Sequence, residues 1–125
     1  MTGQRNQAVG ARGEELATGH LQANGYRILE RNFRSRGGEV DIVARDRDGT
    51  IVFVEVKTRS NLAFGLPQLA VNSRKQRQIA KGALTWLSRN RSHQQAARFD
   101  VIAVLLHDDG CCELEHIVNA FELAY

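Results

Sequence analysis

The sequence predicts an α/β sandwich in which a mixed central β-sheet is covered by two helices. Two long segments carry apolar residues at helical spacing, and five shorter segments rich in Val, Ile and Phe are separated by turn sequences. The chain has 125 residues, of which 42% are hydrophobic and 25% charged, as in an ordinary globular protein. We therefore expect one domain, residues 1–125, with the element order α-β-β-β-α-β-β.

The first helix is expected over about residues 7–24, with Gly25 as its left-handed C-terminal glycine. Helical winding gathers an apolar set on one side, and Gly13 among them would let that side approach the sheet closely. This set contains Val9, Leu16, Ala17, His20 and Leu21. Glu14 lies at the edge of the packing side, whereas Glu15 points nearly opposite, so Glu14 is the acid expected to face the sheet.

Five strands are expected, and a second helix over about residues 72–90 separates the third from the fourth. The strands cover about residues 27–33, 39–45, 51–58, 98–106 and 113–117. The packing side of the second helix consists of Ile79, Ala80, Ala83, Trp86 and Leu87. Its other side is basic and consists of Arg74, Lys75, Arg77, Lys81 and Arg89, with Leu84 as the one apolar residue there.

The second and third strands carry charged residues at positions where a core strand is usually apolar. Side chains alternate along a strand, so Glu55 and Lys57 face the same way. By the same rule Asp41 and Glu39 share a face. The apolar neighbours expected on the opposite face of that strand are Val40 and Ile42.

The turn between these strands decides whether the acids meet. A two-residue turn at Asp48 and Gly49 would separate them. A three-residue loop, 47–49, with Gly49 in the left-handed position pairs Asp41 directly with Glu55. Because such loops are common and favour Gly at that position, we predict the second register, which gathers Asp41, Glu55 and Lys57 in one patch.

Opposed carboxylates repel each other and destabilise a bare sheet, but they suit a hard divalent cation between them. Mg²⁺ prefers oxygen ligands and keeps several waters, which leaves room for a substrate phosphate. An adjacent ammonium would stabilise charge on that phosphate or position the attacking water. The pattern therefore indicates metal-assisted phosphodiester hydrolysis. The alternative is structural: Asp41 as a solvated acid near a turn, and Glu55 with Lys57 as an ion pair on an exposed strand.

Charge is distributed unevenly along the chain. Residues 56–99 contain no acid and nine of the 17 Lys and Arg residues, whereas residues 100–125 contain six acids and no Lys or Arg. This polarity indicates a cationic face that binds a polyanion. The residues expected to contact nucleic acid are Arg59, Arg74, Lys75, Arg77 and Lys81. Alternatively, the acidic end neutralises the basic helix within the chain or across a dimer.

Several classes of protein are disfavoured. No apolar run is long enough to span a bilayer, and the polar start MTGQRNQAVG does not read as a secretory signal, so we expect a cytoplasmic protein without membrane contact. Cys111 and Cys112 lack the partners of a zinc site. The four histidines show no ligand spacing. Two roles remain open for Asp100: capping a strand or supporting the site.

The spacing of the charged residues resembles the PD-(D/E)xK nuclease superfamily, whose core is a helix packed on a hairpin that carries an acid and then Glu-x-Lys. EVK at 55–57 matches the second motif, and Asp41 in GEVD stands at the first. Val40 stands where the superfamily name has proline. That position is a backbone neighbour of the acid and is not itself a metal ligand. The stretch GARGEELATGHLQANGY at 10–26 also resembles the first helix of archaeal Holliday-junction resolvases, which places the helix acid at Glu14.

A narrower resemblance covers nearly the whole chain. The chain resembles the bacterial YraN family, also called UPF0102, in the series RGEELA, GEVDIVARD, VFVEVKTR, FGLPQLAVNSRKQRQI, RFDVIAV and EHIVNAF. This resemblance implies a restriction-endonuclease-like fold, and the wider superfamily implies DNA cleavage with Mg²⁺ or Mn²⁺.

The resemblance also implies roles for individual residues. Asp41 and Glu55 would bind the metal together with the backbone carbonyl of Val56. Lys57 would assist the nucleophilic water, and Glu14 would reach the metal directly or through water. Glu39 is an additional acid on the same face, and one alternative is that it binds a second metal ion.

Three hypotheses follow. The first is a Mg²⁺-dependent endonuclease acting on DNA, including structured or branched DNA in repair or recombination, for which a homodimer would be suitable. The second is a non-catalytic nucleic-acid-binding module with a nuclease-like fold. The third is an assembly partner whose acidic end docks on the basic face of another subunit.

Overall fold

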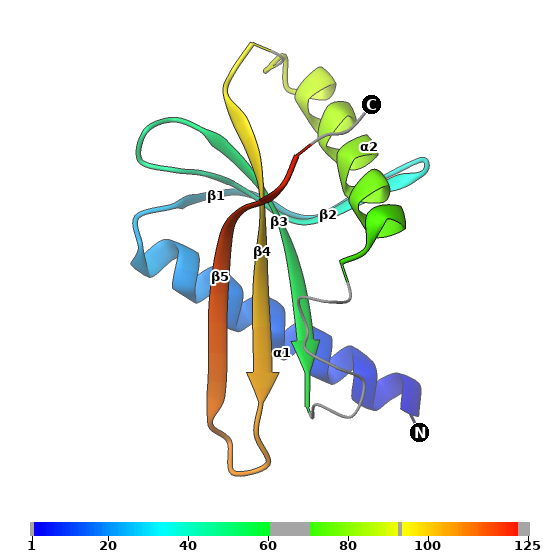
Figure 1. The fold of residues 1–125 in the computed structure, drawn as a ribbon, viewed down its shortest axis with the longest axis vertical. Helices are drawn as coiled ribbons and strands as arrows, with labels where there is room; N and C mark the ends of the chain where they lie inside the picture. Colours follow the sequence, from blue (N-terminus) through cyan, green and yellow to red (C-terminus); the bar gives the residue numbers. More distant parts are fainter. Residues whose placement is uncertain (1, 61–70, 93, 123–125) are drawn as a thin grey trace.

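A computed structural model describes residues 2–60, 71–92 and 94–122, with the side chains from residue 8 onward. The described residues form two helices and five strands in the predicted order (Figure 1). These elements are α1 (Thr2–Ala23), β1 (Arg27–Ser35), β2 (Gly38–Arg45), β3 (Ile51–Arg59), α2 (Ser73–Arg89), β4 (Ala97–Leu106) and β5 (Cys112–Phe121). The predicted α/β fold class is confirmed.

The strands form one mixed sheet in the order β1-β2-β3-β4-β5. β3 and β4 are parallel, and α2 lies in the connection between them, whereas the other neighbouring pairs are antiparallel. In Figure 1, α1 passes behind the sheet and α2 lies beside the turn that joins β1 to β2.

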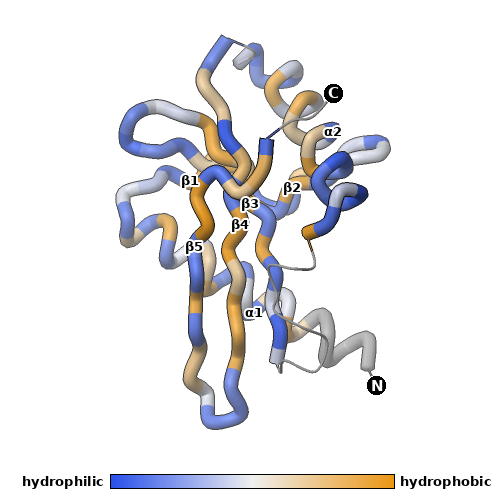
Figure 2. The backbone as a smooth tube through the Cα atoms, in the orientation of Figure 1, coloured by the Kyte–Doolittle hydropathy of each residue, from blue (hydrophilic) through white to orange (hydrophobic). Residues whose placement is uncertain are grey.

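Each helix covers one face of the sheet with its own apolar cluster. Ile79, Ala83 and Trp86 of α2 pack on a cluster that includes Phe53 and Phe99. On the other face, α1 buries Ala17 and Leu21 against a second cluster. The strand residues of that cluster are Ile42, Ala44, Val52, Val54, Ile102 and Val104. Figure 2 shows hydrophobic stretches of β4 and β5 at the centre of the molecule and a hydrophilic β4–β5 turn.

Helix α1 begins at Thr2, so the predicted start at residue 7 is wrong. The first residues carry no apolar periodicity, but Gln and Arg are good helix formers and extend the helix. The helix ends at Ala23, just before the predicted Asn24, and Gly25 has the predicted left-handed conformation, with φ of 85°. Gly13 is buried, and a Cβ at this position would overlap the side chain of Thr58 in β3, so the glycine permits the close approach of α1 to the sheet.

Helix α2 begins after Asn72, whose side chain accepts a hydrogen bond of 3.0 Å from the backbone N–H of Lys75. The helix approaches β2 at a contact between two glycines. A Cβ on Gly38 would overlap the backbone of Gly82, and a Cβ on Gly82 would lie 2.9 Å from the backbone nitrogen of Glu39. This contact holds the middle of α2 close to the start of β2.

One prediction about β2 is wrong. Val40 packs in the α2 cluster, whereas Ile42 packs in the α1 cluster, so the two side chains lie on opposite faces of the sheet. The neighbouring strand is also irregular here: Asn32, between the partners of Val40 and Ile42, has φ of 53°. Asp41 therefore lies between Val40, which faces α2, and Ile42, which faces α1.

Candidate active site

The β2–β3 hairpin has the predicted three-residue loop. The backbone N–H of Asp46 donates to the carbonyl of Thr50 at 2.9 Å, and Gly49 has φ of 91°. The resulting register pairs Ile42 with Val54, so Asp41 comes next to Glu55. The regular ladder ends at this point, and the carboxylate Oδ2 of Asp41 accepts a hydrogen bond of 2.8 Å from the backbone N–H of Val56.

Glu55 is the most enclosed acid of the site, with only 3% of its side chain exposed. Its carboxylate Oε1 lies 3.6 Å from Nζ of Lys57 and 3.4 Å from Nζ of Lys75. Burial and the neighbouring charge of Asp41 raise the pKa of Glu55 to about 8, although both ammonium groups oppose the shift. The charge of Asp41 is thus close enough to disfavour the ionised form of Glu55.

Helix α1 supplies a third acid. Burial and the charge of Asp41 raise the pKa of Glu14, which Arg31 and a side-chain hydrogen bond with Asn32 partly offset. Glu15 is exposed and forms an ion pair of 2.8 Å with Arg31. The prediction that Glu14, and not Glu15, faces the sheet is confirmed.

The other predicted ligand, Glu39, lies against α2. Nζ of Lys75 donates to its Oε1 at 2.6 Å, and this hydrogen bond lowers the pKa of Glu39 against the opposing effect of burial. Lys75 therefore bridges Glu39 and Glu55. The sequence suggested Lys75 for nucleic-acid contact, and the structure places its ammonium group within the cluster of acids.

Two contacts of this region were not predicted, that of Lys75 with the acids and that of Asn32 with Glu14. The proximity of Lys75 to the acids depends on the Asn72 cap and the Gly38–Gly82 contact, of which only the cap has a local sequence signal. Asn32 contacts Glu14 from β1, and its positive φ is tolerated better by Asn than by most residues. An isolated Asn within a strand is too weak a signal to predict that role.

The remaining predicted nucleic-acid residues lie on the surface. Arg74, Arg77 and Lys81 are exposed on α2, and within the described part of the chain they form no ion pair. Arg59 is half-buried at the end of β3, two residues beyond Lys57. A set of unneutralised cations therefore extends from the acids along α2.

Two carboxylate oxygens of this region, Oε1 of Glu14 and Oε2 of Glu55, are buried and have no hydrogen-bond partner. A buried, unpaired carboxylate oxygen is destabilising unless a donor or cation compensates it. Across the described residues, however, no group of three or more His, Cys, Asp or Glu side chains is arranged to hold a metal ion. Asp41 and Glu55 would offer carboxylate oxygens to a hydrated cation, and Val56 a backbone carbonyl.

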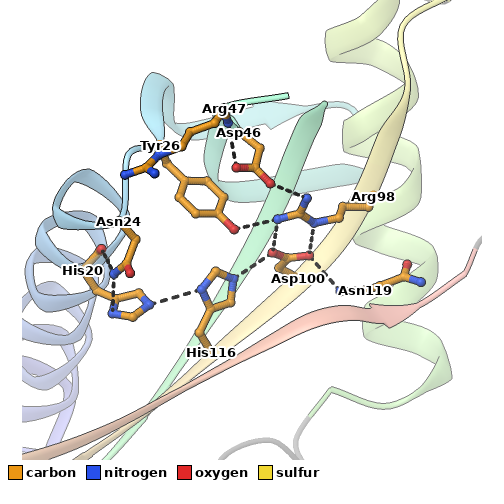
Figure 3. A network of polar contacts seen from close by, with 9 residues as sticks. All are labelled: His20, Asn24, Tyr26, Asp46, Arg47, Arg98, Asp100, His116 and Asn119. Atoms are coloured by element: carbon orange, nitrogen blue, oxygen red, sulfur yellow. Dashed lines mark hydrogen bonds and ion pairs between the residues drawn. The ribbon is translucent and has the colours of Figure 1, made fainter. Parts of the chain in front are cut away.

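A second polar network lies on the α1 side of β4 (Figure 3). Asp100 is fully buried and accepts from His116 at 2.7 Å, from Arg98 at 3.0 Å and from the backbone N–H of Asn119 at 2.9 Å. His116 also lies 3.2 Å from Nε2 of His20. Asp100 therefore anchors β5 to β4. His93 lies outside the described residues.

Arg98 extends this network to the β2–β3 loop and to Tyr26 in the connection from α1 to β1. It donates to Asp46 at 2.7 Å and to the hydroxyl of Tyr26 at 2.7 Å. The network thus ties β4 and β5 to the hairpin that carries Asp41 and Glu55.

The fold class is a restriction-endonuclease-like α/β sandwich with an acid-rich site at the end of the β2–β3 ladder. The chain belongs to the family described as "Uncharacterised protein family UPF0102", whose model matches residues 13–104.

Close relatives match along almost the full chain. A UPF0102 protein of Trichlorobacter lovleyi is 67% identical over 125 residues, covering 100% of this chain and 98% of the relative. Relatives of Pelobacter propionicus and Geobacter metallireducens, also called UPF0102 proteins, are 64% and 58% identical over 96% of this chain and cover 86% and 97% of their own lengths. Neither helix, over its described residues, is long and apolar enough to cross a membrane.

Proposed function

We propose that this protein is a Mg²⁺- or Mn²⁺-dependent nuclease that hydrolyses phosphodiester bonds of DNA in the cytoplasm. The observation that carries the proposal is the pair of adjacent carboxylates, Asp41 and Glu55, in which the buried Oε2 of Glu55 has no hydrogen-bond partner. A sheet gains nothing from such a pair by itself, because the two charges repel each other. A divalent cation between them removes the repulsion and uses the free oxygen.

Each residue has a definite task in this proposal. Asp41, held by the N–H of Val56, and Glu55 would present oxygens to the metal, and Glu14 would orient a water beside it. Lys57 lies 3.6 Å from Glu55 and stabilises charge that develops on the phosphate, or positions the attacking water. A bound divalent ion supplies Lewis-acid polarisation of the phosphate and a more acidic water. The cations of α2 hold the DNA backbone.

A cleavage assay tests the proposal. The protein is incubated with linear, single-stranded and branched DNA in the presence of Mg²⁺, Mn²⁺ or EDTA, beside Glu55→Gln, Lys57→Ala and the matched surface variant Glu15→Gln. We expect metal-dependent cutting that both site variants abolish and Glu15→Gln retains. The substrate panel also identifies the preferred DNA shape, and branched DNA is the substrate for which a homodimer would be expected. Cutting that persists in EDTA or in Glu55→Gln would falsify the proposal.

One observation favours a second function, a non-catalytic nucleic-acid-binding module. Lys57 and Lys75 both lie within 4 Å of Glu55, so ammonium groups already compensate part of its charge without a metal. For a module of this kind, DNA binding is expected to be independent of Mg²⁺ and unchanged by Lys57→Ala. Metal-dependent binding or cutting excludes this alternative.

A further inference from the structure

The turn between β1 and β2 and the facing side of α2 border an open pocket of about 280 Å³. The pocket is lined by Arg34, Ser35, Gly37, Gly38, Glu39 and Gln78. Figure 1 shows the β1–β2 turn beside α2. The volume is near the lower end of the range of small-molecule sites, which is about 300–1,000 Å³, and therefore suits a single nucleotide unit better than a longer segment.

Two glycines keep this wall of the pocket free of side chains. Gly37 has φ of 79°, which a glycine adopts without strain, and Gly38 packs against the backbone of Gly82. The hydroxyl of Ser35 donates to the carbonyl of Gly38 at 3.4 Å across the turn. The wall is thus formed by main-chain atoms, which can approach a ligand closely.

The charges around the pocket favour an anion. The one acid of the lining, Glu39, is neutralised by Lys75 at 2.6 Å. Arg34 is exposed and, over the described residues, makes no ion pair or hydrogen bond, although its charge acts on Glu39. Lys81 lies at the rim, since its Cδ is 3.8 Å from the Cβ position of Gly37, and it also lacks an acidic partner among these residues. Two uncompensated cations therefore border a polar cavity that also contains the amide of Gln78.

The pocket adjoins the candidate active site through a shared residue. Glu39 lines the pocket and binds Lys75, which lies 3.4 Å from Glu55. We propose that the pocket binds a phosphate-bearing nucleotide unit of the substrate strand, next to the phosphodiester bond that is cleaved. This inference rests on the proposed function, because it assumes that a nucleic-acid strand passes the carboxylates. Arg34 contacts the phosphate, and Gln78 and the backbone of the glycine turn contact the rest of the unit.

A titration followed by NMR tests the pocket directly. ¹⁵N-labelled protein in EDTA is titrated with thymidine 5′-monophosphate, and with thymidine as the uncharged probe. We expect the monophosphate to shift the amide signals of Gly37 and Gly38 and the side-chain amide of Gln78, and thymidine to shift them much less. Equal shifts from both probes, or shifts confined to other residues, would overturn the proposal.

Variants separate the contribution of Arg34 from that of general charge. Arg34→Ala removes an exposed, unpartnered cation and is expected to weaken monophosphate binding roughly tenfold, as for a lost charged hydrogen bond. Arg27→Ala is the matched control, because Arg27 is an exposed arginine at the other end of β1. Equal weakening by both variants would show that net charge, and not the pocket, determines binding.

Oligonucleotide binding in EDTA distinguishes the failure of this inference from the failure of the nuclease proposal. Arg34→Ala is expected to lower the slope of log K against log salt concentration by about 0.7 for single-stranded DNA, the loss of one phosphate contact. If wild-type protein cuts DNA but Arg34→Ala leaves the affinity and slope unchanged, the pocket proposal is wrong and the nuclease proposal stands. If Arg34→Ala changes both but no metal-dependent cutting occurs, the pocket binds nucleic acid and the nuclease proposal is wrong.

Discussion

Asp41 and Val56 are joined by a hydrogen bond of 2.8 Å from the backbone N–H of Val56 to the carboxylate of Asp41, at the point where the β2–β3 ladder ends. A side chain here replaces the backbone carbonyl that a regular ladder would provide. The bond fixes Oδ2 of Asp41, and in the proposed function the other oxygen would bind the metal. It also holds the carboxylate beside Glu55, so the local fold and the proposed chemistry depend on the same contact.

Two substitutions at Asp41 separate these two roles. Both Asp41→Asn and Asp41→Ala remove the charge and are expected to abolish metal-dependent cleavage. Only Asp41→Asn retains an oxygen that accepts from Val56, so Asp41→Ala should be less stable than Asp41→Asn by about 1–3 kcal/mol, the cost of an unsatisfied buried donor. Urea unfolding in EDTA measures the difference. Equal stability of the two variants would show that water replaces the carboxylate at this N–H.

The raised pKa of Glu55 predicts a pH dependence of stability in the metal-free protein. The folded pKa of about 8 lies above the ordinary value of 4.5, so the folded state binds the proton more tightly than the unfolded state. The stability that this group contributes is complete below pH 4.5 and is lost as the pH rises through about 8. In EDTA, we expect the free energy of unfolding of the wild type to fall over this range relative to Glu55→Gln.

Urea unfolding of both proteins at several pH values checks the Glu55 prediction, with Glu15→Gln as an exposed control that should follow the wild type. Parallel curves for wild type and Glu55→Gln would mean that Glu55 is ionised in the folded state throughout this range. The environment inferred for the pair of carboxylates would then be wrong.

Asp100 predicts the opposite pH dependence. Burial alone would raise the pKa of Asp100, but hydrogen bonds from His116, Arg98 and the N–H of Asn119 outweigh it and hold the pKa below its ordinary value. Its stabilisation is therefore present above the unfolded pKa of 3.8 and is lost as the pH falls through the lower folded value. Asp100→Asn should destabilise the protein at neutral pH by about 1.5–3 kcal/mol, because His116 and Arg98 lose a charged acceptor, although Arg98 keeps its ion pair with Asp46.

Thermal unfolding at neutral and acidic pH tests the Asp100 prediction. The difference between wild type and Asp100→Asn should shrink in acid. Asp108→Asn, in the exposed β4–β5 turn, serves as the control and should leave the stability nearly unchanged. A loss for Asp100→Asn no larger than that of Asp108→Asn would contradict the network in Figure 3.

The glycine contact between α2 and β2 predicts contrasting effects of one substitution in the two helices. A Cβ on Gly82 would lie 2.9 Å from the backbone nitrogen of Glu39 and 3.1 Å from Cγ2 of Val40, so α2 must move away. We expect Gly82→Ala to destabilise the protein by about 1–3 kcal/mol despite the higher helix propensity of Ala. In α1, a Cβ on Gly19 meets nothing within 4 Å, so Gly19→Ala should stabilise by about 0.5–1 kcal/mol.

Chemical unfolding of the two glycine variants measures these effects, and the sign of the difference is the test. The shift of α2 should also weaken the contact of Lys75 with Glu39. A stabilised Gly82→Ala would show that α2 does not rest on β2 as closely as the structure has it.

Much of the fold followed from local patterns. The apolar side of α2 and the end of α1 at Gly25 were predicted because helical periodicity and a C-terminal glycine are properties of neighbouring residues. The hairpin register was predicted because Gly49 favours a three-residue loop. The adjacency of Asp41 and Glu55 is a consequence of that register. The face of Val40 relative to Ile42 was predicted wrongly, because simple alternation assumes an unbroken strand.

The amino-acid sequence alone determined the α/β class, the two amphipathic helices and the hairpin that brings two acids and an ammonium together, since each depends on the spacing of residues close in the chain. Only the tertiary structure decided that Lys75 bridges Glu39 and Glu55, that Glu14 and Asn32 meet beside Asp41, and that Asp100 anchors β5 away from this site. These contacts join residues from different elements. They depend on how closely the elements pack, as at Gly38 and Gly82, and no local pattern specifies that distance.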